Sequence, residues 1–243
     1  MSTPDYTTDI LIAGAGPAGA VTSIFLAKEK INHIIIDKAI FPRDKICGDA
    51  MSGKTVGILK RITTDWQQYF LDNSEAAVSR GIQFIDSDNN CLSIPFQSNV
   101  VDAKNTPGFV SKRVDFDNTL IKMIDKAYAN FISDCAIESI EHSTEGLLVK
   151  IKHAGIEKTI FTKMIVGADG RGSIVAKKMA MHKVIPEHYS AGIRAYYSNV
   201  AGMHGDNYIE LHFLKEMQPG YFWIFPLPKP TLAVPLGSGK IQK

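Results

Sequence analysis

Near its amino terminus the chain reads Asp9-Ile10-Leu11-Ile12-Ala13-Gly14-Ala15-Gly16-Pro17-Ala18-Gly19-Ala20, an apolar run that leads directly into Gly-x-Gly-x-x-Gly. This order predicts a buried strand, a tight turn and then a helix, expected over residues 20–30. Gly14 permits the turn, Gly16 leaves room for a pyrophosphate beside the backbone, and Gly19 lets the helix pack closely on the strand. Free N–H groups at the start of the helix favour a bound phosphate. The stretch therefore predicts a dinucleotide site.

A second strand, Ile34-Ile35-Ile36, follows the helix and ends at Asp37. This acid stands eighteen residues after Gly19, where a carboxylate can accept hydrogen bonds from the ribose hydroxyls of an adenosine. The alternative is a glycine-rich turn between strand and helix that binds no ligand. The stretch is compatible with either FAD or NAD, so the rest of the chain must distinguish them.

Composition narrows the class of protein. The 243 residues are 45% hydrophobic and 21% charged, which allows one large domain or two small ones with a sizeable core. The formal net charge of +2 and the absence of a long basic run give no support for nucleic-acid binding. Three distant cysteines, without a Cys-x-x-Cys, argue against a metal site or disulfide framework and favour a reducing cytosol. Cys91 and Cys135 are expected to be packing residues.

Residues 10–27 are uncharged and almost long enough to span a bilayer. The segment contains three glycines and a proline, and Asp5 and Asp9 precede it where a signal peptide would carry Lys or Arg. We therefore expect a buried strand and the first helix here, not a membrane segment.

The remaining chain alternates between helical and strand-like patterns. Pro42 and Gly48 indicate a loop over residues 39–49, and a helix is expected over 52–62. Residues 81–86 and 91–96 predict a hairpin. A helix is expected over about 115–129, with Asp115 or Asp117 suited to its dipole and with apolar residues at helical spacing: Phe116, Leu120, Ile121, Ile124 and Ala127. Further strands are expected over 135–140, 147–151, 159–166, 191–197, 208–214, 221–225 and 231–234, with a short helix ending near Ala180.

This order predicts an α/β fold in which a Rossmann-like dinucleotide-binding domain is interleaved with a β-rich substrate domain. The first domain is expected over residues 1–80 and 110–180, and the second over 81–109 and 181–243. The two β-rich pieces could pair into one sheet that covers the nucleotide domain.

The chain resembles the FAD-dependent oxidoreductases of the p-hydroxybenzoate hydroxylase fold and, within them, the geranylgeranyl reductase family. Four segments carry the resemblance: Gly14-Ala15-Gly16-Pro17-Ala18-Gly19 with Asp37; Pro42-Arg43-Asp44-Lys45-Ile46-Cys47-Gly48; Gly167-Ala168-Asp169-Gly170; and Gly220-Tyr221-Phe222-Trp223-Ile224-Phe225-Pro226. The first and third are shared widely among flavoproteins of this fold, whereas the second and fourth point to the prenyl reductases.

The chain also departs from the family pattern. The family has Gly-x-Gly after the aromatic segment, where this chain reads Pro235-Leu236-Gly237. Family members then carry a further Gly-Asp motif that contacts the flavin, followed by a helical part. We therefore expect a truncated or frameshifted product whose substrate domain is incomplete at the C-terminus.

The resemblance implies a set of cofactor-binding residues. Arg43 would be a cofactor ligand, although Arg43 and Lys45 taken alone would more often be solvated surface charges. Asp169 would lie near the pyrophosphate and ribose, with an ordinary Asp-Gly turn as the alternative. Arg113 would lie near the adenosine side. The full set is Gly14, Ala15, Gly16, Pro17, Ala18, Gly19, Asp37, Lys38, Arg43, Cys47, Gly48, Arg113, Ala136, Asp169 and Gly170.

Two segments would serve the reaction. The resemblance places Cys47 and Gly48 facing the isoalloxazine, which makes Cys47 a candidate catalytic residue; an inert packing thiol is the alternative. Tyr221, Trp223 and Phe225 alternate along a strand and so project from one face. With Pro226 they would bind substrate as an apolar wall suited to a prenyl chain or a ring, although burial of a core face is the commoner meaning of such a pattern.

The resemblance implies an FAD-dependent oxidoreductase that reduces carbon–carbon double bonds of an isoprenoid lipid or isoprenoid quinone by hydride transfer from reduced flavin. The sequence contains a single dinucleotide fingerprint, so it gives no sign of a separate NAD(P)H domain. The electron donor would then be NAD(P)H that binds transiently, or a ferredoxin-type partner. A cytoplasmic location is expected, with peripheral contact at the inner membrane face and without metal or nucleic acid. The alternatives are a flavin-dependent aromatic monooxygenase and a catalytically incomplete fragment of such a flavoprotein.

Overall fold

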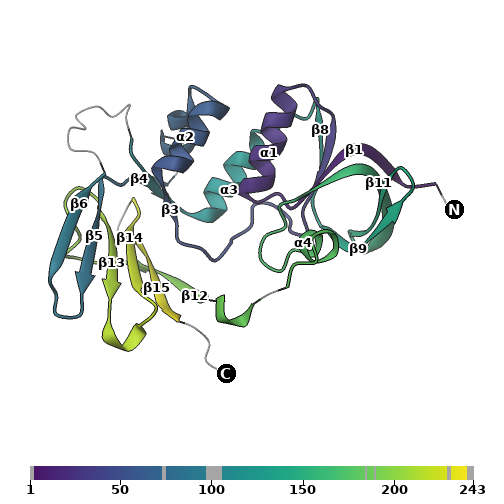
Figure 1. The fold of residues 1–243 in the computed structure, drawn as a ribbon. Coiled ribbons are helices and arrows are strands. Elements are labelled where there is room, and N and C mark those ends of the chain that lie inside the picture. The colour runs from purple at the N-terminus through teal and green to yellow at the C-terminus, as the bar shows by residue number, and fades with distance from the viewer. Residues whose placement is uncertain are drawn as a thin grey trace. The chain divides into compact units, whose positions relative to one another are not determined.

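The computed structural model describes residues 3–72, 75–96, 106–183, 185–188, 190–228 and 231–239. The chain folds as two compact units, each built from two stretches of sequence: Met1–Arg43 with Asp117–Lys183, and Asp44–Phe116 with Val184–Lys243 (Figure 1). The units are interleaved along the sequence, and residues 44–80 and 110–116 lie in the second unit. The assignment of a cofactor domain and a substrate domain stays a prediction.

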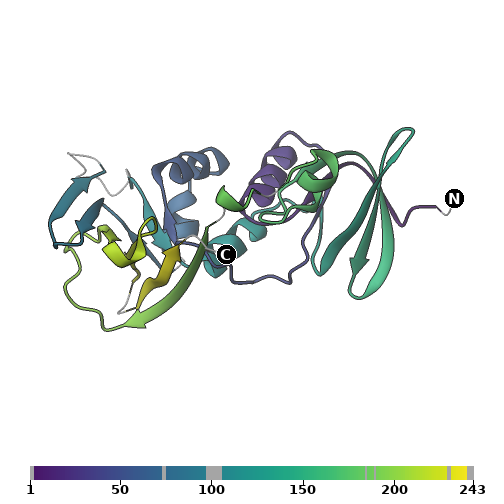
Figure 2. The ribbon, with the colours of Figure 1, turned by 60° about the horizontal axis from the view of Figure 1, so that its bottom comes forward.

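A six-stranded sheet forms the first unit, with the strand order β8-β2-β1-β11-β10-β9. The parallel part is β8 (Ala129–Ile132), β2 (His33–Ile36), β1 (Tyr6–Ala13) and β11 (Ile156–Gly167). The antiparallel part adds β10 (Gly146–His153) and β9 (Cys135–Ser143), the long teal strands in Figure 2. The central parallel strands are apolar because both of their faces are covered. Their buried side chains include Leu11, Ile12, Ile35 and Ile36.

Helices complete the first unit. α1 (Pro17–Lys28) contacts β1 and β2 and buries Ala20, Ser23, Ile24 and Ala27, three or four residues apart, on one face. The helix begins three residues earlier than expected, because a proline is well suited to the first helical position. α4 (Ile174–Met179) contacts β11 and β9. Within the described ranges, no helix combines the length and the apolar character needed to cross a membrane.

The helix expected over 115–129 is shorter than predicted. α3 spans Arg113–Lys122, and the division between the two units falls within it. Residues beyond it form turns and then β8, and Ala127 is exposed. The prediction was wrong at this end because the apolar residues near 129 belong to β8, a half-buried edge strand. β8 pairs with β2, and local periodicity does not report such a pairing.

The larger sheet of the second unit unites the two β-rich pieces, as expected. Its order is β12-β15-β14-β13-β5-β6, and the hairpin of β5 and β6 joins the sheet through a parallel pairing of β5 with β13. Pro235-Leu236-Gly237, where the sequence departs from the family's Gly-x-Gly, lies within β15. The strands are β12 (Ala191–Ser198), β15 (Thr231–Gly239), β14 (Phe222–Pro226), β13 (Ile209–Phe213), β5 (Gly81–Asp86) and β6 (Cys91–Pro95).

A small sheet that the sequence did not predict also belongs to the second unit. It consists of β3 (Ala50–Met51), β7 (Phe109–Ser111) and β4 (Ala76–Val78). α2 (Gly53–Ile62) contacts β3, and a π-helical turn spans Gln68–Asp72. Around β7 the rings of Phe70, Phe109 and Phe116 pack at centroid distances of 5.3 and 6.2 Å. These ring contacts join β7, α3 and the π-helical turn.

Candidate functional site

The glycine turn of the first unit has the geometry that a dinucleotide fingerprint needs. Gly14 follows β1 with φ +95°, and a Cβ there would lie 2.4 Å from the carbonyl oxygen of Ala168. A Cβ at Gly19 would lie 1.8 Å from the carbonyl oxygen of Gly14. Both positions therefore exclude side chains: Gly14 makes the turn, and Gly19 brings the helix onto the strand.

Gly16 leaves open space beside the backbone at the start of α1. Among the described residues, the sole atom within 4 Å of a Cβ placed there is Nη2 of Arg43, at 3.5 Å. Gly16 is the N-cap of α1, and no described side chain caps this end of the helix. The N–H groups of the first turn remain available to an anion, so the residues present fit a pyrophosphate.

Arg43 is held beside this turn by a buried acid. Its Nη1 donates to Oδ2 of Asp117 at 2.8 Å, and the side chains are 18% and 0% exposed. The guanidinium also lies 4.8 Å from the centroid of the Phe41 ring. The interpretation as a solvated surface charge is therefore wrong for Arg43, whereas Lys45 is exposed. Sequence reasoning assigned Asp117 to the helix dipole and missed this pairing across 74 residues.

Asp37 ties the end of β2 to the glycine turn. The carboxylate is buried, and Oδ2 accepts a hydrogen bond from the N–H of Ala15 at 2.7 Å. Oδ1 accepts from the N–H of Ala39 at 2.8 Å. Each oxygen retains a lone pair for a ribose hydroxyl. Ala136 lies nearby, because the N–H of Cys135 donates to the carbonyl oxygen of Asp37; Lys38 is exposed.

The carboxylate of Asp169 caps α4. Asp169 follows β11, and its carboxylate accepts hydrogen bonds from the hydroxyl of Ser173 and from the N–H groups of Ile174 and Val175. Gly170 has φ +70°, the left-handed region that glycine adopts readily. The segment is therefore more than an Asp-Gly turn. The contact of Asp169 and Gly170 with a cofactor stays a prediction.

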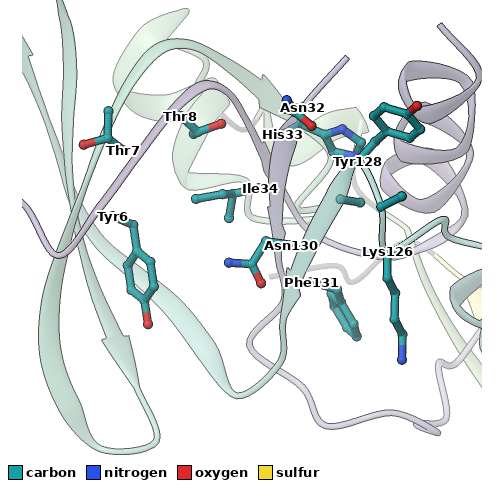
Figure 3. A pocket seen from close by; sticks show the side chains of 12 residues that line it. Tyr6, Thr7, Thr8, Asn32, His33, Ile34, Lys126, Tyr128, Asn130 and Phe131 are labelled. Carbon is teal, nitrogen blue, oxygen red and sulfur yellow. The ribbon is translucent and has the colours of Figure 1, made fainter. Parts of the chain in front are cut away.

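A hollow of about 710 Å³ lies at the opposite end of the parallel strands (Figure 3). It includes the amino-terminal residues of β1, β2 and β8, whereas the glycine turn follows the carboxyl end of β1. Ligands of open α/β sheets bind at the carboxyl ends of the strands, so this hollow is not the dinucleotide site. Its lining residues are Tyr6, Thr7, Thr8, Asn32, His33, Ile34, Lys126, Ala127, Tyr128, Ala129, Asn130 and Phe131.

In the second unit, the loop with Cys47 and Gly48 lies against the aromatic strand β14. A Cβ at Gly48 would lie 2.9 Å from Cε2 of Phe225. Because the neighbouring atom belongs to a ring that is 7% exposed, a larger residue at this position would displace either the loop or the ring. Cys47 itself is exposed. The loop and the strand, distant in sequence, therefore form one surface.

Tyr221, just before β14, and Trp223 and Phe225 within it form a continuous row of rings, as expected for one face. The rings of Tyr221 and Trp223 are 6.1 Å apart, and those of Trp223 and Phe225 are 5.9 Å apart. Trp223 and Phe225 pack with Val110 in a buried cluster, and Pro226 is also buried. Tyr221 is 41% exposed. The face is thus core at one end and accessible surface at the other.

Two aromatic residues that the sequence did not single out continue this face. Phe213 lies 6.0 Å from Tyr221, and Phe84 lies 6.3 Å from Phe213, measured between ring centroids. Phe213 comes from β13, which pairs with β14, and Phe84 comes from β5, which pairs with the other edge of β13. We call the five rings the aromatic track: Phe84, Phe213, Tyr221, Trp223 and Phe225. The sequence did not reveal the track, because β5 lies far from β13 and β14 along the chain and local periodicity does not report which strands pair.

A buried polar network adjoins the Cys47 loop. Asp49 is fully buried, and its carboxylate accepts hydrogen bonds from the hydroxyl of Tyr196 at 2.8 Å and from Nη1 of Arg194 at 3.1 Å. The backbone N–H of Arg113 donates to the same carboxylate at 3.3 Å. Burial raises the pKa of Asp49, and the hydrogen bond from Tyr196 and the charge of Arg194 offset this only in part. Sequence reasoning missed this network, and the predicted flavin contact of Arg113 stays a prediction.

The three cysteines differ sharply in environment. Cys135 is buried, as expected, and burial raises its pKa to about 11. Cys91 is exposed on β6, so its interpretation as a packing residue was wrong: β6 forms the edge of its sheet, and all five of its residues are exposed. Within the described ranges, the structure groups no three His, Cys, Asp or Glu side chains in the way that a metal ion needs.

Alkylation should separate these thiols. At about pH 8, we expect iodoacetamide to modify Cys47 and Cys91 about a hundredfold faster than Cys135, because Cys135 is both covered and protonated. Mass spectrometry of peptides from a time course measures the three rates. In urea the rates should become similar, which is the control. A native Cys135 that reacts as fast as Cys91 would contradict the burial of its thiol.

The glycine turn, the acid at the end of β2 and the fixed arginine define a dinucleotide-binding protein, and the interleaved units give it the p-hydroxybenzoate hydroxylase type of fold. The family model described as "FAD binding domain" matches residues 7–232. The chain therefore belongs to the FAD binding domain family, and its cofactor is FAD.

Known relatives are similar over nearly the whole chain. A menaquinone reductase of Mycobacterium tuberculosis is 24% identical over 241 residues, covering 96% of this chain and 56% of that protein. A digeranylgeranylglycerophospholipid reductase of Methanococcus vannielii is 22% identical over 226 residues, covering 93% of this chain and 54% of that protein. The chain thus spans about half the length of the curated relatives it matches.

Solved structures share the fold. A geranylgeranyl bacteriochlorophyll reductase-like protein from Thermoplasma acidophilum superposes with a TM-score of 0.79 at 20% identity, covering 97% of this chain and 57% of that one. Structures with this fold also include a flavin-dependent halogenase and a probable FAD-dependent monooxygenase. At this level of identity the likeness establishes the fold and not the reaction.

Proposed function

We propose that this chain is the FAD-binding part of an oxidoreductase that reduces carbon–carbon double bonds of an isoprenoid lipid or an isoprenoid quinone. The observation that carries the proposal is the aromatic track, whose end at Phe225 contacts the Gly48 loop. The names of two relatives support it, since one is a menaquinone reductase and the other a reductase of a digeranylgeranyl phospholipid. In this proposal the first unit binds the cofactor and the second binds the substrate.

The residues of the first unit would hold the adenosine and pyrophosphate. The N–H groups after Gly16 and the guanidinium of Arg43 would bind the pyrophosphate by charge-assisted hydrogen bonds. Asp37 would accept from the ribose hydroxyls, and Asp169 with Gly170 would contribute a further contact. Bound reduced flavin would supply the hydride for one alkene carbon, and water or a nearby acid would supply the proton for the other.

The aromatic track would hold the prenyl chain. Its successive rings lie 5.9–6.3 Å apart, and Phe213 and Tyr221 are 39% and 41% exposed. An apolar chain placed across the accessible rings would gain about 0.8 kcal/mol for each buried methylene. A compact aromatic substrate would use little of this length. The track therefore favours a long hydrocarbon chain over the monooxygenase alternative.

A buried donor in the track favours a quinone among the two substrate classes. The indole Nε1 of Trp223 is buried and has no hydrogen-bond partner among the described residues. A buried indole N–H usually finds an acceptor, and a quinone offers carbonyl oxygens next to its prenyl chain. We propose NAD(P)H or a ferredoxin-type protein as the electron donor, and peripheral membrane contact because such substrates reside in membranes.

The purified protein should be tested for flavin chemistry. We expect it to take up FAD, to bleach on anaerobic reduction, and to recover its absorbance when a prenyl quinone or prenyl lipid is added under argon. Omission of the prenyl acceptor is the control. Product hydroxylation coupled to oxygen would instead support the monooxygenase alternative. A protein that stays colourless with added FAD would support the incomplete fragment.

A further inference from the structure

A single arginine of the second unit binds three residues of one loop. Arg194 lies on β12, and its side chain is 4% exposed. Nη1 donates to the carbonyl oxygen of Lys45 at 3.2 Å and to Oδ1 of Asp49 at 3.1 Å. Nη2 donates to Oδ2 of Asp44. Arg194 therefore joins the two ends of the segment 44–49, which carries Cys47 and Gly48 and which we call the 44–49 loop.

One end of this loop is fixed independently of Arg194. The carbonyl oxygen of Asp49 accepts a hydrogen bond from the N–H of Ser111 on β7 at 2.9 Å. The hydroxyl of Tyr196, which shares a face of β12 with Arg194, donates to Oδ2 of Asp49. Asp49 also leads directly into β3. The other end of the loop is Asp44, whose side chain is 56% exposed and whose carboxylate binds Arg194.

The charges of the cluster suit this arrangement. Burial acts to raise the pKa of Asp44, but the hydrogen bonds from Arg194 and from the backbone N–H of Lys45, together with the charges of Arg194 and Arg113, outweigh it and lower the pKa. Asp44 therefore stays ionised at neutral pH and remains an ion-pair partner of Arg194. The guanidinium also lies 4.6 Å from the centroid of the Tyr196 ring, which holds its plane. The planar guanidinium of an arginine carries several donors and can reach three acceptors at once, whereas the ammonium group of a lysine cannot do so in this geometry.

We propose that Arg194 is a positioning residue that closes the 44–49 loop and thereby fixes Cys47 and Gly48. Its effect on the flavin rests on the proposed function, in which this loop faces the isoalloxazine. The closure itself is a property of the second unit alone. Because Gly48 of the loop packs on Phe225, release of Asp44 would loosen the contact between the loop and the aromatic track.

Hydrogen exchange of the cofactor-free chain tests the closure. Arg194→Gln removes all three contacts, and Asp44→Asn weakens the contact at the exposed end without leaving a buried charge. We expect amide exchange of residues 45–48 to rise about tenfold in both variants, with no change in the β5–β6 hairpin. Arg80→Gln is the matched control, because Arg80 is exposed in the same unit. Exchange equal to that of the control in Asp44→Asn overturns the proposal, even if Arg194→Gln fails to fold.

The reduction potential of bound FAD tests the positioning. We expect the potential to shift in Asp44→Asn and Arg194→Gln relative to Arg80→Gln, and Arg194→Lys not to restore it. Faster exchange with an unchanged potential would show that the loop is closed for stability alone and would overturn the positioning role. If the parent chain binds no FAD, the proposed function fails, while the exchange experiment still decides whether Arg194 closes the loop.

Discussion

Replacement of Gly19 by alanine is expected to abolish FAD binding and to lower the free energy of unfolding by roughly 3 kcal/mol, because the new Cβ overlaps backbone. That Cβ would lie 1.8 Å from the carbonyl oxygen of Gly14 and 3.3 Å from Cβ of Ala168. Relief requires α1 to move away from the glycine turn, which removes its N–H groups from the pyrophosphate. Urea unfolding followed by circular dichroism and titration with FAD measure the two effects.

Gly57→Ala provides the matched control. Gly57 lies in α2, and nothing among the described residues comes within 4 Å of a Cβ placed there. Alanine is the better helix former by up to about 1 kcal/mol, so this variant should be as stable as the parent or more stable, with unchanged FAD affinity. A Gly19→Ala variant that binds FAD like Gly57→Ala would contradict the close approach of α1 to the turn.

Replacement of Arg43 by methionine is expected to weaken FAD binding by roughly 10- to 100-fold, the value of a charge-assisted hydrogen bond to phosphate. It should also lower the free energy of unfolding by about 2–4 kcal/mol, because the fully buried carboxylate of Asp117 loses its ion-pair partner. Calorimetric titration with FAD and chemical unfolding provide the measurements. Lys45→Met, an exposed cation in the same segment, should change neither quantity appreciably.

A double variant separates the two roles of Arg43. Arg43→Met combined with Asp117→Leu removes the charge together with its buried partner, so much of the lost stability should return. The affinity for FAD should remain low, because the positive charge beside Gly16 is still absent. Recovery of affinity together with stability would show that Arg43 acts only by holding α3 in place. That outcome would remove Arg43 from the cofactor-binding set.

Local sequence patterns predicted most of the secondary structure. The fingerprint strand, α1, α2 and the β5–β6 hairpin were each recognised from apolar periodicity and turn residues, with ends displaced by at most a few residues. These signals act between neighbours in sequence and do not need the rest of the chain. The prediction failed at the end of α3, where the apolar residues near Ala129 pair with β2. It also failed at Cys91, because exposure depends on which strand forms the edge of the sheet.

Part of the fingerprint is local: Gly14 has the positive φ of the turn, and a Cβ at Gly19 would overlap the carbonyl oxygen of Gly14. The spacing of the glycines therefore indicates a dinucleotide site without the rest of the chain. Contacts between distant segments leave no comparable pattern in the sequence. Arg194 reaches Asp49 across 145 residues, and Phe84 joins Tyr221 through a strand pairing that periodicity does not encode. The role of Arg194 in the loop and the alignment of the aromatic rings depend on burial and on hydrogen bonds between distant residues. Only the tertiary structure decides them, because it brings these residues within contact distance.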